Sequence, residues 1–115
     1  MVKLLKNKYN FLRDVAHLNQ KDRKVYLKEC CDDNIHTICE AVDNVLKNVC
    51  PTNGRVKKKV KSMDKELKKI ANIKTKVSLK RDLLSAPQTG NGIFSIIAST
   101  VLPFLVDLLT KRKSK

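Results

Sequence analysis

Closely spaced lysines are the most distinctive reactive groups of this 115-residue chain. Residues 55–81 hold ten lysines and two arginines, whereas the wider segment 51–91 holds three acids. Ammonium groups act as point charges toward phosphates, while bidentate recognition of bases favours arginine. Every Phe and Tyr lies outside the segment and the chain has no Trp, so stacking platforms for single strands are missing. The pattern predicts binding of duplex nucleic acid through its phosphates, without sequence preference and with strong salt dependence.

We expect eleven of these cations to contact the phosphates: Arg55, Lys57, Lys58, Lys61, Lys65, Lys68, Lys69, Lys74, Lys76, Lys80 and Arg81. The competing interpretation is a solvated, lysine-rich face of an intramolecular bundle. The formal net charge of +14 is concentrated in this segment, because residues 1–50 carry nine basic and seven acidic groups. A field this strong and localised favours a polyanion, either duplex nucleic acid or an acidic membrane face.

Cysteines and histidines do not form a pattern that predicts a metal site or a catalytic site. Cys30, Cys31, Cys39 and Cys50 match no zinc-ligand spacing, and we expect buried free thiols. His17 and His36 stand isolated, and neither a phosphate-binding loop nor a dinucleotide fingerprint occurs. We therefore expect no cofactor, no metal and no enzymatic activity. No secretory signal is visible at the N-terminus, which predicts an intracellular protein with reduced thiols.

The lysines are predicted to lie on helices of a small all-α bundle. The chain divides into a three-helix unit at 1–50, a basic helical segment at 51–85, a flexible junction at 86–92 and a hydrophobic segment at 93–115. Helices are expected at 3–18 and, capped by Asn19, at about 20–30. A third begins at a cap by Asp32 or Asp33 and ends at Pro51. Its apolar residues fall on one helical face: Ile35, Ile38, Cys39, Val42, Val45, Leu46 and Val49.

The basic segment is predicted to form one helix from about residue 55 to residue 70 or beyond. Its narrow apolar seam steps by four and three residues and consists of Val56, Val60, Met63, Leu67 and Ile70. Lys58, Lys61, Lys65 and Lys69 fall on the opposite side, so one edge can dock on the N-terminal helices while the other offers ammonium groups. A break is expected at 71–77 and a short helix at 79–84, capped by Ser78.

The tail at 93–109 is apolar, with Asp107 as its one charge. Seventeen residues lie at the short limit for spanning a bilayer, and Pro103 and Asp107 interrupt the run. Lys111, Arg112, Lys113 and Lys115 follow, which suits an anionic surface. The residues expected to dock on a membrane or a partner are Ile93, Phe94, Ile97, Val101, Leu102, Phe104 and Leu105. Alternatively, the tail completes the core of the bundle, docks on a protein or is removed by proteolysis.

Residues 77–84, the glycine-bearing loop, and the apolar runs 93–97 and 101–105 resemble the C-terminal region of small basic proteins of Maverick/Polinton elements and adintoviruses. That group in turn resembles the precursor of the adenoviral mu core protein. The upstream layout is similar too: an early helix, a Cys-containing helix at 38–41, an Asn-Val-Leu-Lys run at 44–47 and a basic helix. The resemblance implies a structural virion protein that condenses double-stranded DNA, located in the virion and the host nucleus.

The sequence Gln88-Thr89-Gly90-Asn91-Gly92 is similar to the sites cut by adenovirus-type cysteine proteases. That similarity implies maturation cleavage between Asn91 and Gly92, although the family's adjacent glycines are here separated by Asn91. An exposed loop with glycines would suit entry into a protease cleft. The same residues could instead form a turn or hinge.

The leading hypothesis is thus a virion core protein that binds duplex DNA and is processed by such a protease. A second is a membrane-active or capsid-lining minor protein that acts through the tail on capsid proteins or an anionic membrane. A third is a helical adaptor, at about residues 2–70, that docks a host protein. A further alternative is self-association of the chain as a homo-oligomer.

Overall fold

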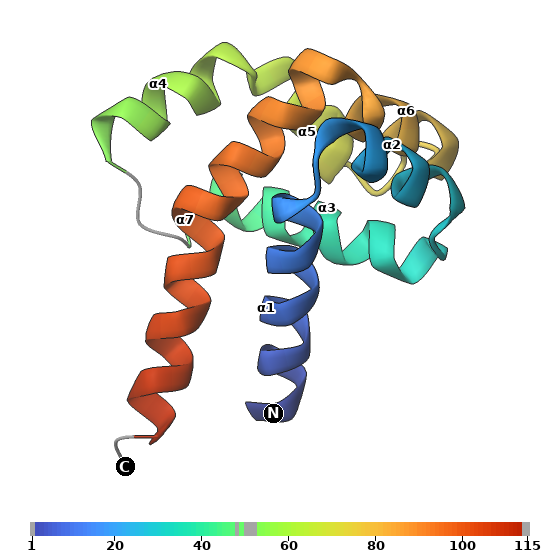
Figure 1. Cartoon of the computed structure of the whole chain (residues 1–115). Helices are drawn as coiled ribbons and strands as arrows, with labels where there is room; N and C mark the ends of the chain where they lie inside the picture. Colours follow the sequence, from blue (N-terminus) through green and yellow to red (C-terminus); the bar gives the residue numbers. More distant parts are fainter. Residues whose placement is uncertain (1, 48, 50–52, 114–115) are drawn as a thin grey trace.

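The computed structural model describes residues 2–47, 49 and 53–113, with the backbone alone at 2–5, 87–88 and 111–113. These residues form helices and no strand, which confirms the predicted all-α bundle with a long apolar C-terminal helix (Figure 1). The helices are α1 (Val2–His17), α2 (Gln20–Glu29), α3 (Asp32–Leu46), α4 (Gly54–Ser62), α5 (Asp64–Ala71), α6 (Val77–Ser85) and α7 (Pro87–Lys113).

The corner between α1 and α2 forms as the sequence predicts. The side-chain Oδ1 of Asn19 accepts a hydrogen bond of 2.8 Å from the backbone N–H of Asp22, which satisfies one of the donors left free at the start of α2. Asp22 itself lies in the first turn, where its negative charge is favourable at the helix N-terminus.

Replacing Asn19 by alanine should therefore lower the free energy of unfolding by about 1 kcal/mol. The reason is that the N–H of Asp22 loses its partner, and the 3.1 Å hydrogen bond from Nδ2 of Asn19 to the Asp22 carboxylate is lost as well. Urea denaturation followed by circular dichroism measures the difference, and Asn10→Ala, in the middle of α1, serves as the control. A loss no larger than that of the control would show that the cap contributes nothing.

Helix α3 buries the predicted apolar face, with Ile35, Ile38, Cys39, Val42 and Val45 inside the core. Its ends differ from the prediction. Cys31 occupies the cap position without a side-chain hydrogen bond, and the two aspartates lie in the first turn. The helix ends at Leu46, and Val49 is 47% exposed. The predicted stop at Pro51 lies outside the described residues.

The basic segment forms two helices rather than the single helix predicted. Met63 has φ −108° and ψ 15°, so the chain turns there between α4 and α5. This turn lets α4 pack against α7 while α5 packs against α3. The predicted seam is nevertheless used within the chain, because Val56, Leu67 and Ile70 are buried and Val60 and Met63 are half-buried.

Helix α7 is the central element, and it begins earlier than the sequence predicts. The junction at 86–92 was expected to be a flexible loop, but α7 starts at Pro87 and includes both Gly90 and Gly92. A proline costs nothing at the first position of a helix, where its missing N–H has no partner within the helix. The prediction of a loop is therefore wrong: α6 and α7 meet at a tight corner around Ala86.

The apolar tail supplies a large share of the core. Ile93, Phe94, Ile97, Val101, Leu102 and Leu105 are buried and Phe104 is half-buried. Helix α7 packs most extensively on α1, and the two run side by side at the lower end of the molecule, where both chain ends lie (Figure 1). The alternative in which the tail completes the bundle is the arrangement observed.

Candidate nucleic-acid interface

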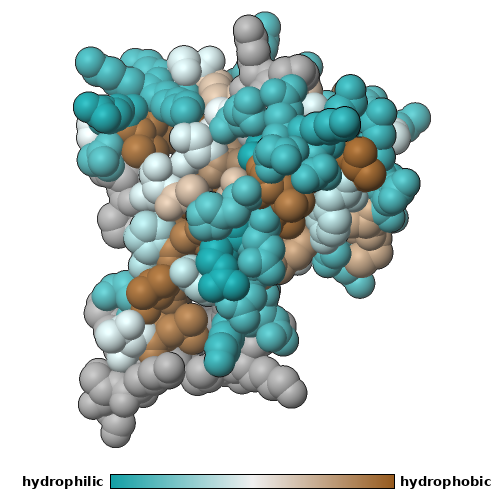
Figure 2. Space-filling view, viewed as in Figure 1, coloured by the Kyte–Doolittle hydropathy of each residue, from teal (hydrophilic) through white to brown (hydrophobic). Residues whose placement is uncertain are grey.

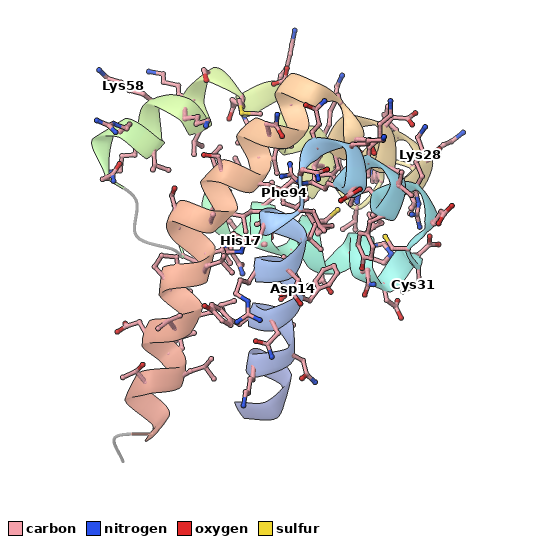
Figure 3. All side chains as sticks on the ribbon, viewed as in Figure 1. Asp14, His17, Lys28, Cys31, Lys58 and Phe94 are labelled. Atoms are coloured by element: carbon pink, nitrogen blue, oxygen red, sulfur yellow. The ribbon has the colours of Figure 1, made fainter. Side chains whose placement is uncertain are left out.

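Ten cations on α4, α5 and the α5–α6 connection are exposed and form what we call the basic surface: Arg55, Lys57, Lys58, Lys59, Lys61, Lys65, Lys68, Lys69, Lys74 and Lys76. Nine of them were predicted from the sequence to bind phosphates. The tenth, Lys59, was not in the predicted set. Lys58 points away from the body of the protein (Figure 3). Most of the surface of α4 and of the neighbouring upper part of the molecule is hydrophilic, with small apolar patches between, whereas a hydrophobic band follows the lower part of α7 (Figure 2).

These cations have almost no intramolecular counter-charges. Lys68 forms an ion pair of 2.9 Å with Asp64, but both side chains are well exposed and such pairs contribute little. None of the other nine lies within ion-pair distance of a carboxylate in the part of the chain that the structure describes. The charges are therefore available to an external anion.

Helix α4 owes this exposure to the distribution of its residues around the helix axis. Val56 and Val60 lie on the side that packs against α7, and at about 100° per residue the cations occupy the rest of the circumference. Lys57 and Lys61 are four residues apart and repel each other, which weakens an isolated helix. Asn53 offsets part of this cost, because its Oδ1 accepts a 2.9 Å hydrogen bond from the N–H of Val56.

Two of the predicted phosphate-binding residues are not available on this surface. Lys80 is 2% exposed and its ammonium group lies beside the Cys39 thiol. Burial raises the pKa of Cys39, and the charge of Lys80 acts in the opposite direction. The sequence alone could not show this, because the exposure of a lysine on a short helix depends on what packs over it.

Arg81 is occupied by contacts within the protein. Its Nη1 donates a 2.6 Å hydrogen bond to the carbonyl oxygen of Leu27, and its Nη2 pairs with Asp32 at 2.9 Å. Hydrogen bonding to Asp32 raises the pKa of Arg81. Arg81 therefore ties α6 to the ends of α2 and α3 instead of offering a charge to solvent.

Arg23 is a buried residue whose role the sequence analysis missed. Its guanidinium donates hydrogen bonds to the carbonyl oxygens of Val15, Ala16 and Leu18 at 3.3, 3.4 and 2.8 Å, and to Oδ1 of Asn91 at 3.0 Å. It also lies 4.7 Å from the ring centre of Phe94. Burial lowers the pKa of Arg23. The group joins the C-terminal end of α1 to α7, and no spacing in the sequence distinguishes it from the exposed lysines nearby.

The residues that resemble a protease cleavage motif are built into this packing. A Cβ atom on Gly90 would lie 2.3 Å from the backbone oxygen of Leu84, and one on Gly92 would lie 2.6 Å from the sulfur of Met63. The glycines thus permit close contact of α7 with α6 and with Met63. A protease would reach the Asn91–Gly92 bond only after these turns of α7 unwound. The backbone at Gln88 is helical, and its side chain lies outside the described residues.

The cysteines are unpaired where the structure describes them: Cys30 is half-buried, Cys31 exposed and Cys39 buried. Within the described residues no group of three or more His, Cys, Asp or Glu side chains is arranged to hold a metal ion. Cys50 lies outside the described residues.

One stretch of α7, Thr89–Thr110, is long and apolar enough to cross a membrane by length and composition. Half of it is buried inside the protein, as in the core helix of a bundle. The side chains of the basic residues after 110 lie outside the described residues. Membrane insertion would require α7 to leave α1 and the core.

The fold and the exposed charges together describe a small helical bundle with a cationic surface on one group of helices. No family model, no curated protein and no solved structure matches this chain.

Proposed function

We propose that this protein binds double-stranded DNA without sequence preference, through the basic surface, and neutralises the charge of the backbone. The observation that carries the proposal is the set of nine exposed cations that have no partner among the carboxylates of the described residues. Each contact with a phosphate would release counterions, and this release supplies most of the free energy of non-specific binding. It would also remove the repulsion among the lysines of α4.

Duplex DNA suits this surface better than a single strand or an anionic membrane does. Single-stranded nucleic acid is bound by aromatic stacking, and α4, α5 and α6 hold no aromatic residue. An anionic membrane would be favoured by a free apolar helix, but half of the apolar stretch of α7 is buried in the core, including Phe94, Ile97 and Val101. The proposal that the protein condenses DNA in a virion core, after import into the host nucleus, rests on the resemblance to adintoviral and Polinton proteins. A cysteine protease of the adenovirus type would cut at Asn91 before α7 folds or after it opens.

Two matched triple variants test whether the basic surface is the interface. Lys57, Lys58 and Lys61 on α4 are replaced by glutamine in one, and Lys21, Lys24 and Lys28 on α2 in the other. All six side chains are exposed and the loss of charge is equal, while Lys28 and Lys58 lie at opposite sides of the molecule (Figure 3). Binding to a 30-base-pair duplex of random sequence is followed by fluorescence anisotropy from 50 to 300 mM KCl.

We expect the slope of log K against log salt to fall by about 2 to 3 in the α4 variant, because each lost phosphate contact removes about 0.9 from the slope. The α2 variant should change it by less than about 1, which is the effect of losing distant charge. Equal slopes in the two variants would place the interface elsewhere. A wild-type affinity that hardly changes with salt would contradict the proposal as a whole.

A further inference from the structure

Ile73 is an apolar side chain held almost completely in solvent. It is 92% exposed, whereas the other exposed large hydrophobic residues lie between 44% and 54%. It belongs to the connection between α5 and α6, where the sequence Asn72-Ile73-Lys74-Thr75-Lys76 offers no second apolar residue to cover it. An isoleucine in this position does nothing for the core, because it contributes no burial to the folded chain.

The turn that carries Ile73 is built from specific hydrogen bonds. Asn72 ends α5, and its side-chain Oδ1 accepts a hydrogen bond of 2.9 Å from the N–H of Lys74. Its carbonyl oxygen accepts a second bond, of 3.1 Å, from the N–H of Thr75. Both bonds close around Ile73, so the side chain is held at the tip of an ordered turn directly after a helix that packs on α3.

Lysines flank this tip on both sides. Lys74 and Lys76 follow within about 11 Å of chain, given 3.8 Å between successive Cα atoms. Lys69 lies one helical turn before Asn72, near the end of α5. All three side chains are exposed, and none forms an ion pair with a described carboxylate. An apolar tip between unpaired ammonium groups matches a surface that is anionic at its edges and apolar between them, and Glu40 and Asp43 of α3 line the same pocket as Ile73.

We propose that Ile73 is a wedge that enters the minor groove of duplex DNA and inserts between two neighbouring base pairs. This inference rests on the proposed function, because Lys69, Lys74 and Lys76 would hold the phosphates on either side. Proteins that bend DNA without reading its sequence insert isolated apolar side chains in this way, and the unstacked step bends the duplex. The wedge would convert a surface that neutralises DNA into one that also bends it, which favours compaction.

A membrane is the other partner that such a tip could enter. Binding at a bilayer surface depends on a broad apolar helix face. Ile73 stands alone in its turn and offers no such face, so a single base-pair step fits it better than a bilayer does. Binding to anionic vesicles becomes an outcome of the test.

The experiment compares the wild-type chain with Ile73→Ser, Ile73→Leu and Val25→Ser. Val25 is 54% exposed on α2, so Val25→Ser is a matched loss of an exposed apolar side chain. The probe is a 30-base-pair duplex that carries 2-aminopurine at one TA step and a donor and acceptor dye at its ends. Anisotropy reports binding, 2-aminopurine fluorescence reports unstacking, and energy transfer reports bending. Vesicles of phosphatidylcholine and phosphatidylserine are assayed in parallel.

For the wild type, Ile73→Leu and Val25→Ser we expect salt-dependent binding, a rise in 2-aminopurine fluorescence and a bent duplex. Ile73→Ser should keep the salt slope and an affinity within about threefold, since burying the wedge and unstacking the bases offset each other. It should lose the fluorescence rise and the bend. Binding by the wild type without unstacking or bending would overturn the wedge and leave the proposed function intact. If the wild type shows no salt-dependent binding to the duplex, both the wedge and the proposed function are wrong. The same holds if the protein binds vesicles through Ile73 and does not bind the duplex.

Discussion

Replacing Arg23 by methionine should lower the free energy of unfolding by about 2 to 4 kcal/mol, the range for breaking a buried hydrogen-bond network. Methionine keeps an apolar stem of similar length, so the loss is mainly polar. The carbonyl oxygens of Ala16 and Leu18, at the end of α1, would lose their bonds to the guanidinium. The substitution also removes a positive charge from the C-terminal end of α1 and from the face of the Phe94 ring. Both are places where a positive charge is favourable.

Urea denaturation monitored by circular dichroism measures this effect, and Lys24→Met is the matched control. Lys24 is the next residue on α2, is exposed and has the same charge, so its replacement should change stability by less than about 0.5 kcal/mol. Arg23→Lys keeps the charge but not the planar set of donors, and should restore only part of the loss. Indistinguishable denaturation midpoints for Arg23→Met and Lys24→Met would show that Arg23 does not join α1 to α7.

Replacing Gly90 by alanine should lower the free energy of unfolding by about 1 to 3 kcal/mol through overpacking, even though alanine is about 1 kcal/mol better than glycine within a helix. The new Cβ would lie 2.3 Å from the backbone oxygen of Leu84. No side-chain rotation can relieve a contact with backbone, so the corner between α6 and α7 would have to open.

The two other glycines serve as internal controls for this prediction, with thermal and urea denaturation as the measurements. A Cβ on Gly54 would meet no atom within 4 Å, so Gly54→Ala should be neutral or stabilising by up to about 1 kcal/mol. A Cβ on Gly92 would meet the flexible end of Met63, which can move, so Gly92→Ala should fall between the two. If Gly90→Ala is as stable as Gly54→Ala, the close corner is not required, and the exposed loop predicted from the sequence becomes tenable again.

The position of Gly90 and Gly92 within α7 shows a limit of prediction from sequence patterns. Proline and glycine residues such as Pro87, Gly90 and Gly92 are common in loops, so the sequence favoured a loop here. Each of these residue types also has a place within a helix. Proline suits the first turn of a helix, and glycine suits a place where two backbones meet. Which use applies depends on Leu84 and Met63, and neither is recognisable in the sequence as a packing partner of α7.

The exposure of the lysines was easier to predict than the helical junction, because charge patterning is a local property. Nine of the eleven predicted cations are exposed, since long charged side chains stay in water unless a partner group compensates for their burial. Lys80 and Arg81 are the exceptions, and both lie on α6, whose position against α2, α3 and α5 is a tertiary outcome. The regular spacing of the apolar seam likewise gave no sign of the turn at Met63. That turn directs α4 onto α7 and α5 onto α3.

The helical class, the cap at Asn19, the buried face of α3 and the excess of positive charge could be read from the amino-acid pattern. Each of these follows from interactions among residues a few positions apart. Tertiary structure alone decided that the apolar tail is core, that Arg23 joins α1 to α7, and that Ile73 stays in solvent. Those outcomes depend on which surfaces meet across long separations in the chain, and contacts of that kind leave no periodic trace in the sequence.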